Sequence, residues 1–410
     1  MLSRCEHDCT PRWDAKVEVD SEAAEMRIAI LATDLREEHR KYELPSPYFH
    51  PAIEAFLQGL AGLPEADIHV ISCAQQPMRS PQKIADHIYF HSLHVPKIGW
   101  LRTFYQGCIR AVRRKLQEIQ PNLVHGHGTE RDCAICAIFS GFPNLVSIHG
   151  NVGRVAKSIS ASTGSFWWCA AVLERFTMPR TGGVLCNSAY TESVVRIHAR
   201  RTWRVPNAVR REFFETPISK KPTPAKPILL SVGVVSPYKR QLELLELARD
   251  LHREGNVFEL QFIGAADRKS RYGALFLDQI AIAERNGFAR YLGTKSLPEL
   301  IATLDSASAL IHAPAEEAFG LVVAEGLSRN LKFFGTAVGG VSDIVSGVEY
   351  AEPFSPDDQL ALRTAIANWL HAGCPQPRLA AEEMHSRYHP EVIAKRHLEI
   401  YREFLGTRSN

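Results

Sequence analysis

The 410-residue sequence lacks any apolar run close to the roughly 20 residues that a membrane-spanning helix needs. It also begins without the charged start, apolar stretch and cleavage site of a secretory signal peptide. These absences predict a cytoplasmic protein. They leave peripheral contact with the inner face of a membrane open.

An excess of charge of one sign is missing as well. The chain has 48 Lys and Arg against 45 Asp and Glu, a formal net charge of +3. A general nucleic-acid-binding protein would carry a concentrated basic face, so this class is not expected.

Cysteine is not abundant either, and its spacing fits no metal-binding layout. The nine cysteines are an odd number scattered along a long chain, which predicts thiols and not a disulfide framework. Cys5 and Cys9 could form a zinc set with Cys133 and Cys136. The second pair, however, falls in an apolar run typical of a helix core, and the spacing lacks a finger or ribbon pattern. We therefore predict no metal.

What the chain has is apolar content, 45%, and enough length for two domains. Strand-like runs alternate with helical patterns, which predicts an α/β fold with parallel sheets. Residues 1–25 are polar and predicted to be a disordered extension. A proline-rich polar linker at 210–227 separates a first domain, 26–209, from a second that begins at residue 228.

The most informative stretch runs from Pro314 to Gly326. It follows an apolar strand pattern and continues as a helix, which we expect to begin near Phe319 or Gly320. Glu317 would then lie in the loop and Glu325 in the first two helical turns. The first helical amides, those of Gly320, Leu321 and Val322, would face whatever fills the loop.

Amides at a helix start favour phosphate, whereas carboxylates can accept hydrogen bonds from neighbouring hydroxyl groups. A sugar joined to a nucleotide diphosphate offers both kinds of group. The alternative is that Glu317 and Glu325 are solvated residues that only complement the helix dipole.

The two glutamates, seven residues apart within Pro-x-x-Glu-x-Phe-Gly-Leu-Val-x-x-Glu, resemble the signature of the retaining GT-B glycosyltransferases of family 4, also called group 1. The stretch from Gly339 to Val345 is similar to that family's Gly-Gly-x-Pro-Glu-Ile-Val. This resemblance implies two Rossmann-like domains that face each other across a cleft. It also implies a second domain ending near residue 385 and a return helix, 386–410, that crosses back to the first domain.

Two further segments resemble the family in the first domain. Pro121–Gly128 is similar to Pro-Asp-x-Val-His-x-His-Gly, and Asn144–Asn151 is similar to a segment ending in Thr-x-His-Gly. The resemblance implies that His149 faces the donor sugar and phosphate from across the cleft. Alternatively, His149 is a histidine whose hydrogen bonds are satisfied within its own loop.

The second domain has a matching lysine but lacks a matching arginine. Lys239 corresponds to a lysine that neutralises the donor diphosphate in the family, whereas Val234 stands where the family has arginine. Arg240 is the nearest residue that could restore the charge. In the first domain, Thr33–Glu37 replaces the family's glycine pair, so the phosphate contact there is open.

Together these features predict transfer of a hexose from a nucleotide diphosphate sugar to a hydroxyl of a glycan or lipid-linked glycan, with retention. No cofactor and no metal are expected. The alternatives are a non-catalytic GT-B protein that binds nucleotide sugars and a phosphorylase-like GT-B enzyme. The predicted catalytic residues are Glu317 and His149, and the predicted donor-binding residues are Lys239, Arg240, Phe319, Gly320, Leu321, Val322 and Glu325. Among these, Glu325 is predicted to bind the ribose.

Membrane contact has two candidate locations. A helical pattern from Trp100 to Ile119 carries four basic residues beside an apolar stripe, and a solvated face is the simpler interpretation. Trp167 and Trp168, just before a second helical pattern, could form an acceptor or membrane rim. Ordinary packing is the simpler interpretation there too.

Overall fold

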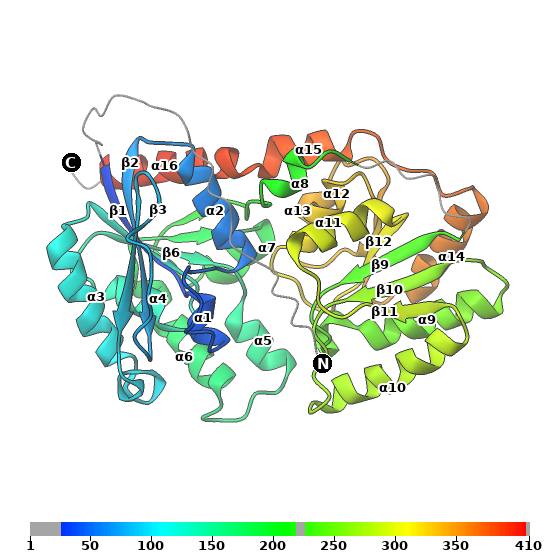
Figure 1. The fold of residues 1–410 in the computed structure, drawn as a ribbon, viewed down its shortest axis with the longest axis horizontal. Coiled ribbons are helices and arrows are strands. Elements are labelled where there is room, and N and C mark those ends of the chain that lie inside the picture. Colours follow the sequence, from blue (N-terminus) through cyan, green and yellow to red (C-terminus); the bar gives the residue numbers. More distant parts are fainter. Residues whose placement is uncertain (1–25, 219–225, 407–410) are drawn as a thin grey trace, which may run out of the picture.

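The computed structural model describes residues 26–218 and 226–406, which form two α/β lobes side by side (Figure 1). The predicted extension 1–25 lies outside the described residues, as do residues 219–225 of the predicted linker. A short helix, α8 (Glu212–Glu215), lies in the described part of that linker.

The first lobe contains a sheet of eight strands in the order β3-β4-β2-β1-β5-β6-β7-β8, parallel except for the β3–β4 pair. Its strands are β1 (Met26–Leu31), β2 (Ala66–Ala74), β3 (Lys83–Ala85), β4 (Ile88–His94), β5 (Leu123–His127), β6 (Asn144–Ile148), β7 (Val184–Cys186) and β8 (Thr202–Arg204). The central strands β1 and β5 are almost wholly buried. Helices cover both faces of a parallel sheet, which accounts for the apolar run from Ile28 to Leu31 in β1. In β5 the buried His125 and His127 have hydrogen-bond partners in Ser147 and His149.

The helices of the first lobe are α1 (Leu35–Glu38), α2 (Pro51–Ala61), α3 (Gln106–Ile119), α4 (Asp132–Ile138), α5 (Val152–Ser158), α6 (Phe166–Thr177) and α7 (Ala189–Val195), with 3-10 helices η1 (Lys97–Gly99), η2 (Leu101–Thr103) and η3 (Met178–Arg180).

The second lobe contains a six-stranded sheet, in the order β11-β10-β9-β12-β13-β14, whose neighbours are all parallel. Its strands are β9 (Ile228–Val232), β10 (Glu259–Ile263), β11 (Ala289–Tyr291), β12 (Ala309–His312), β13 (Lys332–Thr336) and β14 (Ala351–Phe354). Its helices are α9 (Gln241–Arg253), α10 (Arg271–Arg285), α11 (Leu297–Ser306), α12 (Leu321–Leu327), α13 (Val341–Val345) and α14 (Gln359–His371), with the 3-10 helix η4 (Pro237–Lys239).

The chain then returns to the first lobe. Helix α15 (Ala380–Tyr388) lies against α12, and α16 (Pro390–Gly406) packs on α2 (Figure 1). Leu398, Ile400 and Tyr401 of α16 are buried in the core of the first lobe. The predicted two Rossmann-like domains with a helix crossing back are therefore confirmed.

The predicted helix from Trp100 begins later than expected. Residues 97–103 form η1 and η2, Phe104 and Tyr105 have φ of 48° and 57°, and α3 starts at Gln106. Trp100 anchors this turn because its Nε1 donates to Val95 O at 3.0 Å and its ring packs edge-on against Tyr105. The predicted apolar stripe is buried at Ile109, Val112 and Leu116, whereas Phe104 is 60% exposed because packing of Trp100 and Tyr105 interrupts the helix before Gln106.

Within residues 26–218 and 226–406, no helix combines the length and the apolar content that crossing a bilayer requires.

Candidate active site

The loop that carries Glu317 joins the end of β12 to the start of α12, at the carboxyl edge of the second sheet. Ligands of open parallel α/β sheets bind at this edge. Gly320 precedes the helix with φ of 96°, a left-handed conformation that favours glycine. The helix therefore begins at Leu321, close to the expected position, and Glu325 lies in its second turn.

Two glycines hold this loop in place. A Cβ on Gly339 would lie 1.6 Å from the backbone oxygen of Glu317, and one on Gly340 would lie 2.6 Å from Ala318 O. Gly340 N also donates to Glu317 O at 3.3 Å. The glycine pair lets two backbone segments meet and so fixes where Glu317 lies.

The Glu317 carboxylate is held by two partners. Its Oε2 accepts from Lys239 Nζ at 2.6 Å and lies 2.9 Å from His312 Nε2. Burial by itself would raise the pKa of Glu317, but the charge of Lys239 and the hydrogen bond from His312 outweigh it and lower the pKa to about 2. The result is a permanently ionised carboxylate. Sequence analysis missed His312, whose only signal was its place at the end of a strand.

Glu325 is buried and points toward the interface between the lobes. Its Oε1 lies 3.3 Å from Arg210 Nη2, and Arg210 Nη1 lies 3.7 Å from Glu54 Oε2 on α2. Burial raises the pKa of Glu325 despite the opposing effect of Arg210. Arg210 thus bridges carboxylates of both lobes, and the predicted ribose-binding residue already has a cationic partner.

His149 follows β6 and belongs to a short chain of polar side chains. Its Nε2 lies 3.1 Å from His127 Nδ1, and its Nδ1 lies 3.1 Å from Asn207 Oδ1. Burial lowers the pKa of His149 to about 4, so its ring is neutral at neutral pH. Both ring nitrogens have protein partners, so His149 must exchange one of them to contact a ligand.

Contacts across the cleft join the Glu317 loop to the start of α7. Ser188 Oγ donates to Ala318 O at 2.6 Å, and Tyr190 Oη donates to Glu316 Oε1 at 2.5 Å. Asp343 Oδ2, just after the glycine pair, accepts from Ala189 N at 2.6 Å. The two lobes therefore meet at the loop that carries the candidate carboxylate.

Two family models match adjacent parts of this chain. "Glycosyltransferase Family 4" matches residues 52–213 and "Glycosyl transferases group 1" matches residues 213–384. The chain belongs to the group 1 glycosyltransferases.

Known glycosyltransferases are similar in sequence and in fold. The GPI3 subunit of phosphatidylinositol N-acetylglucosaminyltransferase from Saccharomyces cerevisiae is 23% identical over 316 residues, which cover 73% of this chain and 67% of the relative. Sucrose-phosphate synthase from Thermosynechococcus elongatus aligns with a TM-score of 0.69 at 17% identity, over 93% of this chain and 100% of that one. HepE from Anabaena, in complex with UDP and glucose, aligns with a TM-score of 0.65 at 14% identity, over 92% of this chain and 99% of HepE. At these identities the two structures support the GT-B fold alone.

The neighbouring side chains of Lys239 and Arg240 contact different parts of the second lobe. Nη1 of Arg240 donates to Pro356 O at 3.2 Å, and the Arg240 side chain lines a pocket with Thr336 and Asp358. Val234, in the place of the family's arginine, is 57% exposed. Lys239 therefore supplies the positive charge nearest to Glu317, and the missing arginine is not visibly replaced by its neighbour.

The Phe319 side chain is part of the core, so only its backbone is available to a ligand. Its ring is buried edge-on against Tyr388 of α15, with ring centroids 5.6 Å apart. Leu321 and Val322 are half-buried, and their amides have no acceptor within α12 because they belong to its first turn. Any donor contact at this helix start is thus made by amides.

The segment that replaces the family's glycine pair is tied into the protein. Arg36 is fully buried and pairs with Asp34, with Nη2 to Oδ2 at 2.7 Å. Its remaining donors reach Leu44 O, Arg79 O and Ser80 Oγ. Glycine at this position would leave room for a phosphate, whereas the Asp34–Arg36 pair gives the loop a fixed structure.

One buried side chain beside His149 has no hydrogen-bond partner among the described residues. Both polar atoms of the Asn151 amide are buried and unpaired, and so is Nε2 of His127. Buried polar groups are nearly always satisfied, by ligand or water if not by protein. Asn151 was noted in the sequence only as part of a motif, and its lack of a partner makes it a candidate ligand contact.

Proposed function

We propose that this glycosyltransferase moves a hexose from a nucleotide diphosphate sugar to a hydroxyl of a glycan or lipid-linked acceptor, with retention of configuration. The observation that carries the proposal is the Glu317 carboxylate, kept ionised by Lys239 and His312 beside the first amides of α12. HepE, a structural neighbour, was solved with UDP and glucose. UDP-glucose is therefore the first donor to test.

The proposed reaction breaks the bond between the anomeric carbon and the diphosphate oxygen, and forms one to the acceptor oxygen. Negative charge grows on the departing diphosphate, where Lys239 and the amides of Gly320, Leu321 and Val322 can stabilise it. Positive charge grows on the sugar, where the Glu317 carboxylate faces it. The acceptor's proton leaves to the diphosphate.

Lys239 and Glu317 are paired before the donor binds because both charges are largely shielded from solvent, with side-chain exposures of 18% and 15%. Charged groups in such positions each need a partner. When the diphosphate arrives, Lys239 can turn to it, while Glu317 keeps its contact with His312. His149 and Asn151 of the other lobe would then hold sugar or acceptor hydroxyls.

The first test is a screen of nucleotide sugars for thermal stabilisation and slow donor hydrolysis, with excess chelator in a parallel series. We expect at least one donor to be hydrolysed, at the same rate with and without chelator, because fixed cations and amides supply the positive charge. A loss of activity that added metal restores, at a temperature where the protein stays folded in chelator, would contradict the metal-free scheme. Stabilisation by the nucleotide without hydrolysis of any donor would favour the non-catalytic alternative, which Val234 and the Asp34–Arg36 pair also favour.

We further propose that an exposed aromatic face on α5 and α6 rests on an anionic lipid surface. Trp167 and Trp168 lie within α6, not before it, and are 39% and 40% exposed. The apolar side chains exposed with them are Phe139, Ile159, Phe166, Val172 and Phe176. Aromatic residues prefer the interface between lipid and water.

The exposed charged residues of α5, α6 and η3 are all basic: they are Arg154, Lys157, Arg175 and Arg180. Glu174, the acidic residue of α6, is turned inward: it accepts from Thr129 Oγ1 and from two amides at the start of α5. The other candidate for membrane contact, α3, buries Ile109, Val112 and Leu116 and leaves its arginines solvated, as in the simpler interpretation of its sequence.

Vesicle binding tests this surface. Arg154→Ala/Lys157→Ala should weaken binding to vesicles containing phosphatidylserine by roughly 30-fold, at about 1 kcal/mol per basic residue, and added salt should weaken the parent protein similarly. Trp167→Ala/Trp168→Ala should weaken binding even at low salt. Phe104→Ala, at another exposed aromatic residue of the same lobe, serves as the matched control. Equal binding by all variants would show that this face does not contact lipid.

A further inference from the structure

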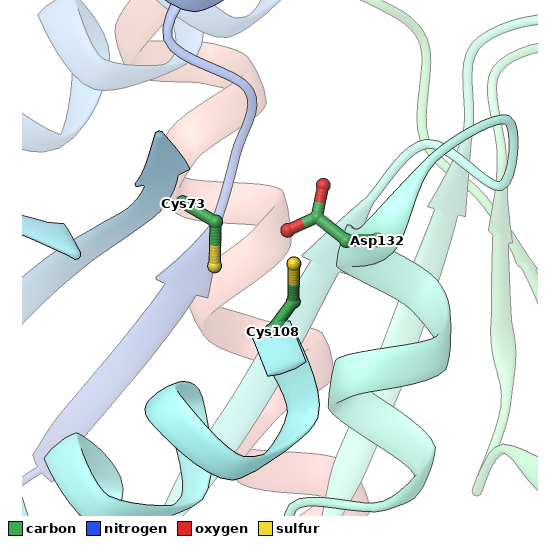
Figure 2. A group of neighbouring side chains, drawn as sticks. All are labelled: Cys73, Cys108 and Asp132. Carbon is green, nitrogen blue, oxygen red and sulfur yellow. The ribbon is translucent and has the colours of Figure 1, made fainter. Parts of the chain in front are cut away.

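A cluster of three buried side chains in the first lobe is independent of the cleft. Cys73 lies near the end of β2, Cys108 in the first turn of α3, and Asp132 at the first residue of α4 (Figure 2). One ligand atom from each, two sulfurs and a carboxylate oxygen, lie within 4.8 Å of one another. Three elements far apart in sequence thus bring metal-ligating groups to one point.

Burial makes this arrangement unusual. Cys73, Cys108 and Asp132 are all buried, and Asp132 shares its carboxylate with the Cys73 thiol. A thiol is a weak hydrogen-bond donor, so it compensates poorly for burying a carboxylate. The cationic neighbour, Arg131, compensates the Asp132 carboxylate in part, but its guanidinium also lies over the ring of Trp100 and pairs with Glu38. A bound cation would add to this compensation.

We propose that Cys73, Cys108 and Asp132 form a site for a soft divalent cation, best met by Zn²⁺. Thiolate ligands select zinc over the hard cations magnesium and calcium. Tetrahedral zinc, with Zn–S bonds of about 2.3 Å, needs sulfurs about 3.7 Å apart. The two sulfurs lie within 4.8 Å of each other, so a small approach of the Cys73 and Cys108 side chains would bring them to this separation. As each Zn–S bond forms, the thiol gives its proton to solvent.

Local structure favours the anionic ligands that zinc requires. Cys108 and Asp132 lie in the first turns of α3 and α4, where the helix dipole stabilises negative charge. Cys136 is one turn after Asp132 on the same face of α4 and is also buried. It is a candidate for the fourth ligand.

The expected role is structural. The ion would tie the end of β2 to the starts of α3 and α4. It would thereby fix the loop from β5 to α4, in which Thr129 contacts Glu174 of α6. The ion takes no part in breaking the donor bond. Metal uptake can therefore be measured without substrate, and its failure would not bear on the glycosyltransferase proposal.

Metal titration of the full-length, reduced protein tests the site. Cys5→Ser/Cys9→Ser serves as the background, because these two thiols could bind zinc elsewhere. We expect one equivalent of Zn²⁺ to bind and raise the melting temperature, and Co²⁺ to give thiolate-to-cobalt charge-transfer absorption. Asp132→Asn should weaken Zn²⁺ binding at least tenfold, and Cys73→Ser/Cys108→Ser should abolish it.

Cys374→Ser is the matched control, because it removes a buried thiol from the second lobe. It should bind Zn²⁺ like the background protein. The proposal fails if the background protein takes up no Zn²⁺ or Co²⁺. It also fails if Cys73→Ser/Cys108→Ser still shows the cobalt–thiolate absorption. Should that variant not fold, Asp132→Asn decides the question: a Co²⁺ affinity at least tenfold weaker, followed by the same absorption in a protein with retained thermal unfolding, supports the site, and an unchanged affinity overturns it.

Discussion

Glu317→Gln should lower the turnover of the glycosyltransferase by about 10²–10³-fold, the effect typical of removing one group that stabilises transition-state charge. The amide keeps an oxygen that can accept from His312 but loses the charge that faces the developing positive charge on the sugar. It also releases Lys239 from its ion pair. Affinity for the free nucleotide diphosphate should therefore stay the same or rise.

Steady-state rates with the intact donor, beside calorimetric titration with the bare nucleotide, measure the two effects separately. Glu316→Gln is the matched control, since it makes the same change one residue away and keeps an acceptor for Tyr190. Unchanged turnover in Glu317→Gln, or weaker binding of the bare nucleotide, would show that Glu317 does not face the reacting sugar.

The low pKa of Glu317 gives this residue a defined pH behaviour. A carboxyl group shifted from 4.5 to about 2 contributes stability that is present above its unfolded pKa and is lost as the pH falls through that interval. Glu317 is thus ionised at any pH where the protein is assayed. An acidic limb in the rate profile near neutrality must come from another group or from the substrate.

The α/β fold with parallel sheets could be predicted from local patterns, because parallel sheets have a strong local signature, whereas the facing domains and the return helix were implied by the family resemblance. The buried runs of β1, β9 and β12 are continuous and end at loops, so strand positions and the carboxyl edge could be predicted. The loop before α12 was predicted closely for the same reason, since Gly320 marks a conformation that other residues rarely adopt.

Partners of the candidate residues could not be predicted. Lys239 and Glu317 are 78 residues apart and Arg210 and Glu325 are 115 apart, and no local pattern reports which side chains meet at such distances in the sequence. Arg240 shows the same limit, because its direction toward Pro356 depends on a left-handed backbone at φ 55°. Periodicity reports which face of an element is buried, but not what packs against it.

The family that this sequence resembles commonly has glycine where Asn330 stands and a Pro-Val pair where Phe333 and Phe334 stand, and both departures are accommodated by packing. Asn330 takes a left-handed φ of 55°, which asparagine tolerates better than most residues, and its Oδ1 accepts from Ala381 N. Phe333 and Phe334 are fully buried in β13, where Phe334 packs edge-on against Trp369. Departures at the cleft, such as Val234, have no such compensation and bear on function.

Glu325→Ala should weaken the intact donor and the free nucleotide equally, by about 10- to 150-fold, the equivalent of about 1.5–3 kcal/mol for a hydrogen bond to a charged group. Turnover at saturating donor should change little, because a ribose contact is the same before and during the reaction. Calorimetry with both ligands and rates at saturation measure these effects.

Glu54→Ala decides whether that loss reflects the ribose or the contact between lobes. Glu54 is the other carboxylate beside Arg210, at 3.7 Å, but lies on α2 of the first lobe. The Glu54→Ala substitution should disturb Arg210 as Glu325→Ala does, without removing a group from the second lobe, where the nucleotide is proposed to bind. If Glu54→Ala weakens the nucleotide as much as Glu325→Ala does, Glu325 acts by anchoring Arg210 between the lobes, and its assignment to the ribose is wrong. If only Glu325→Ala weakens the nucleotide, Arg210 is a partner that the ribose hydroxyls replace when donor binds.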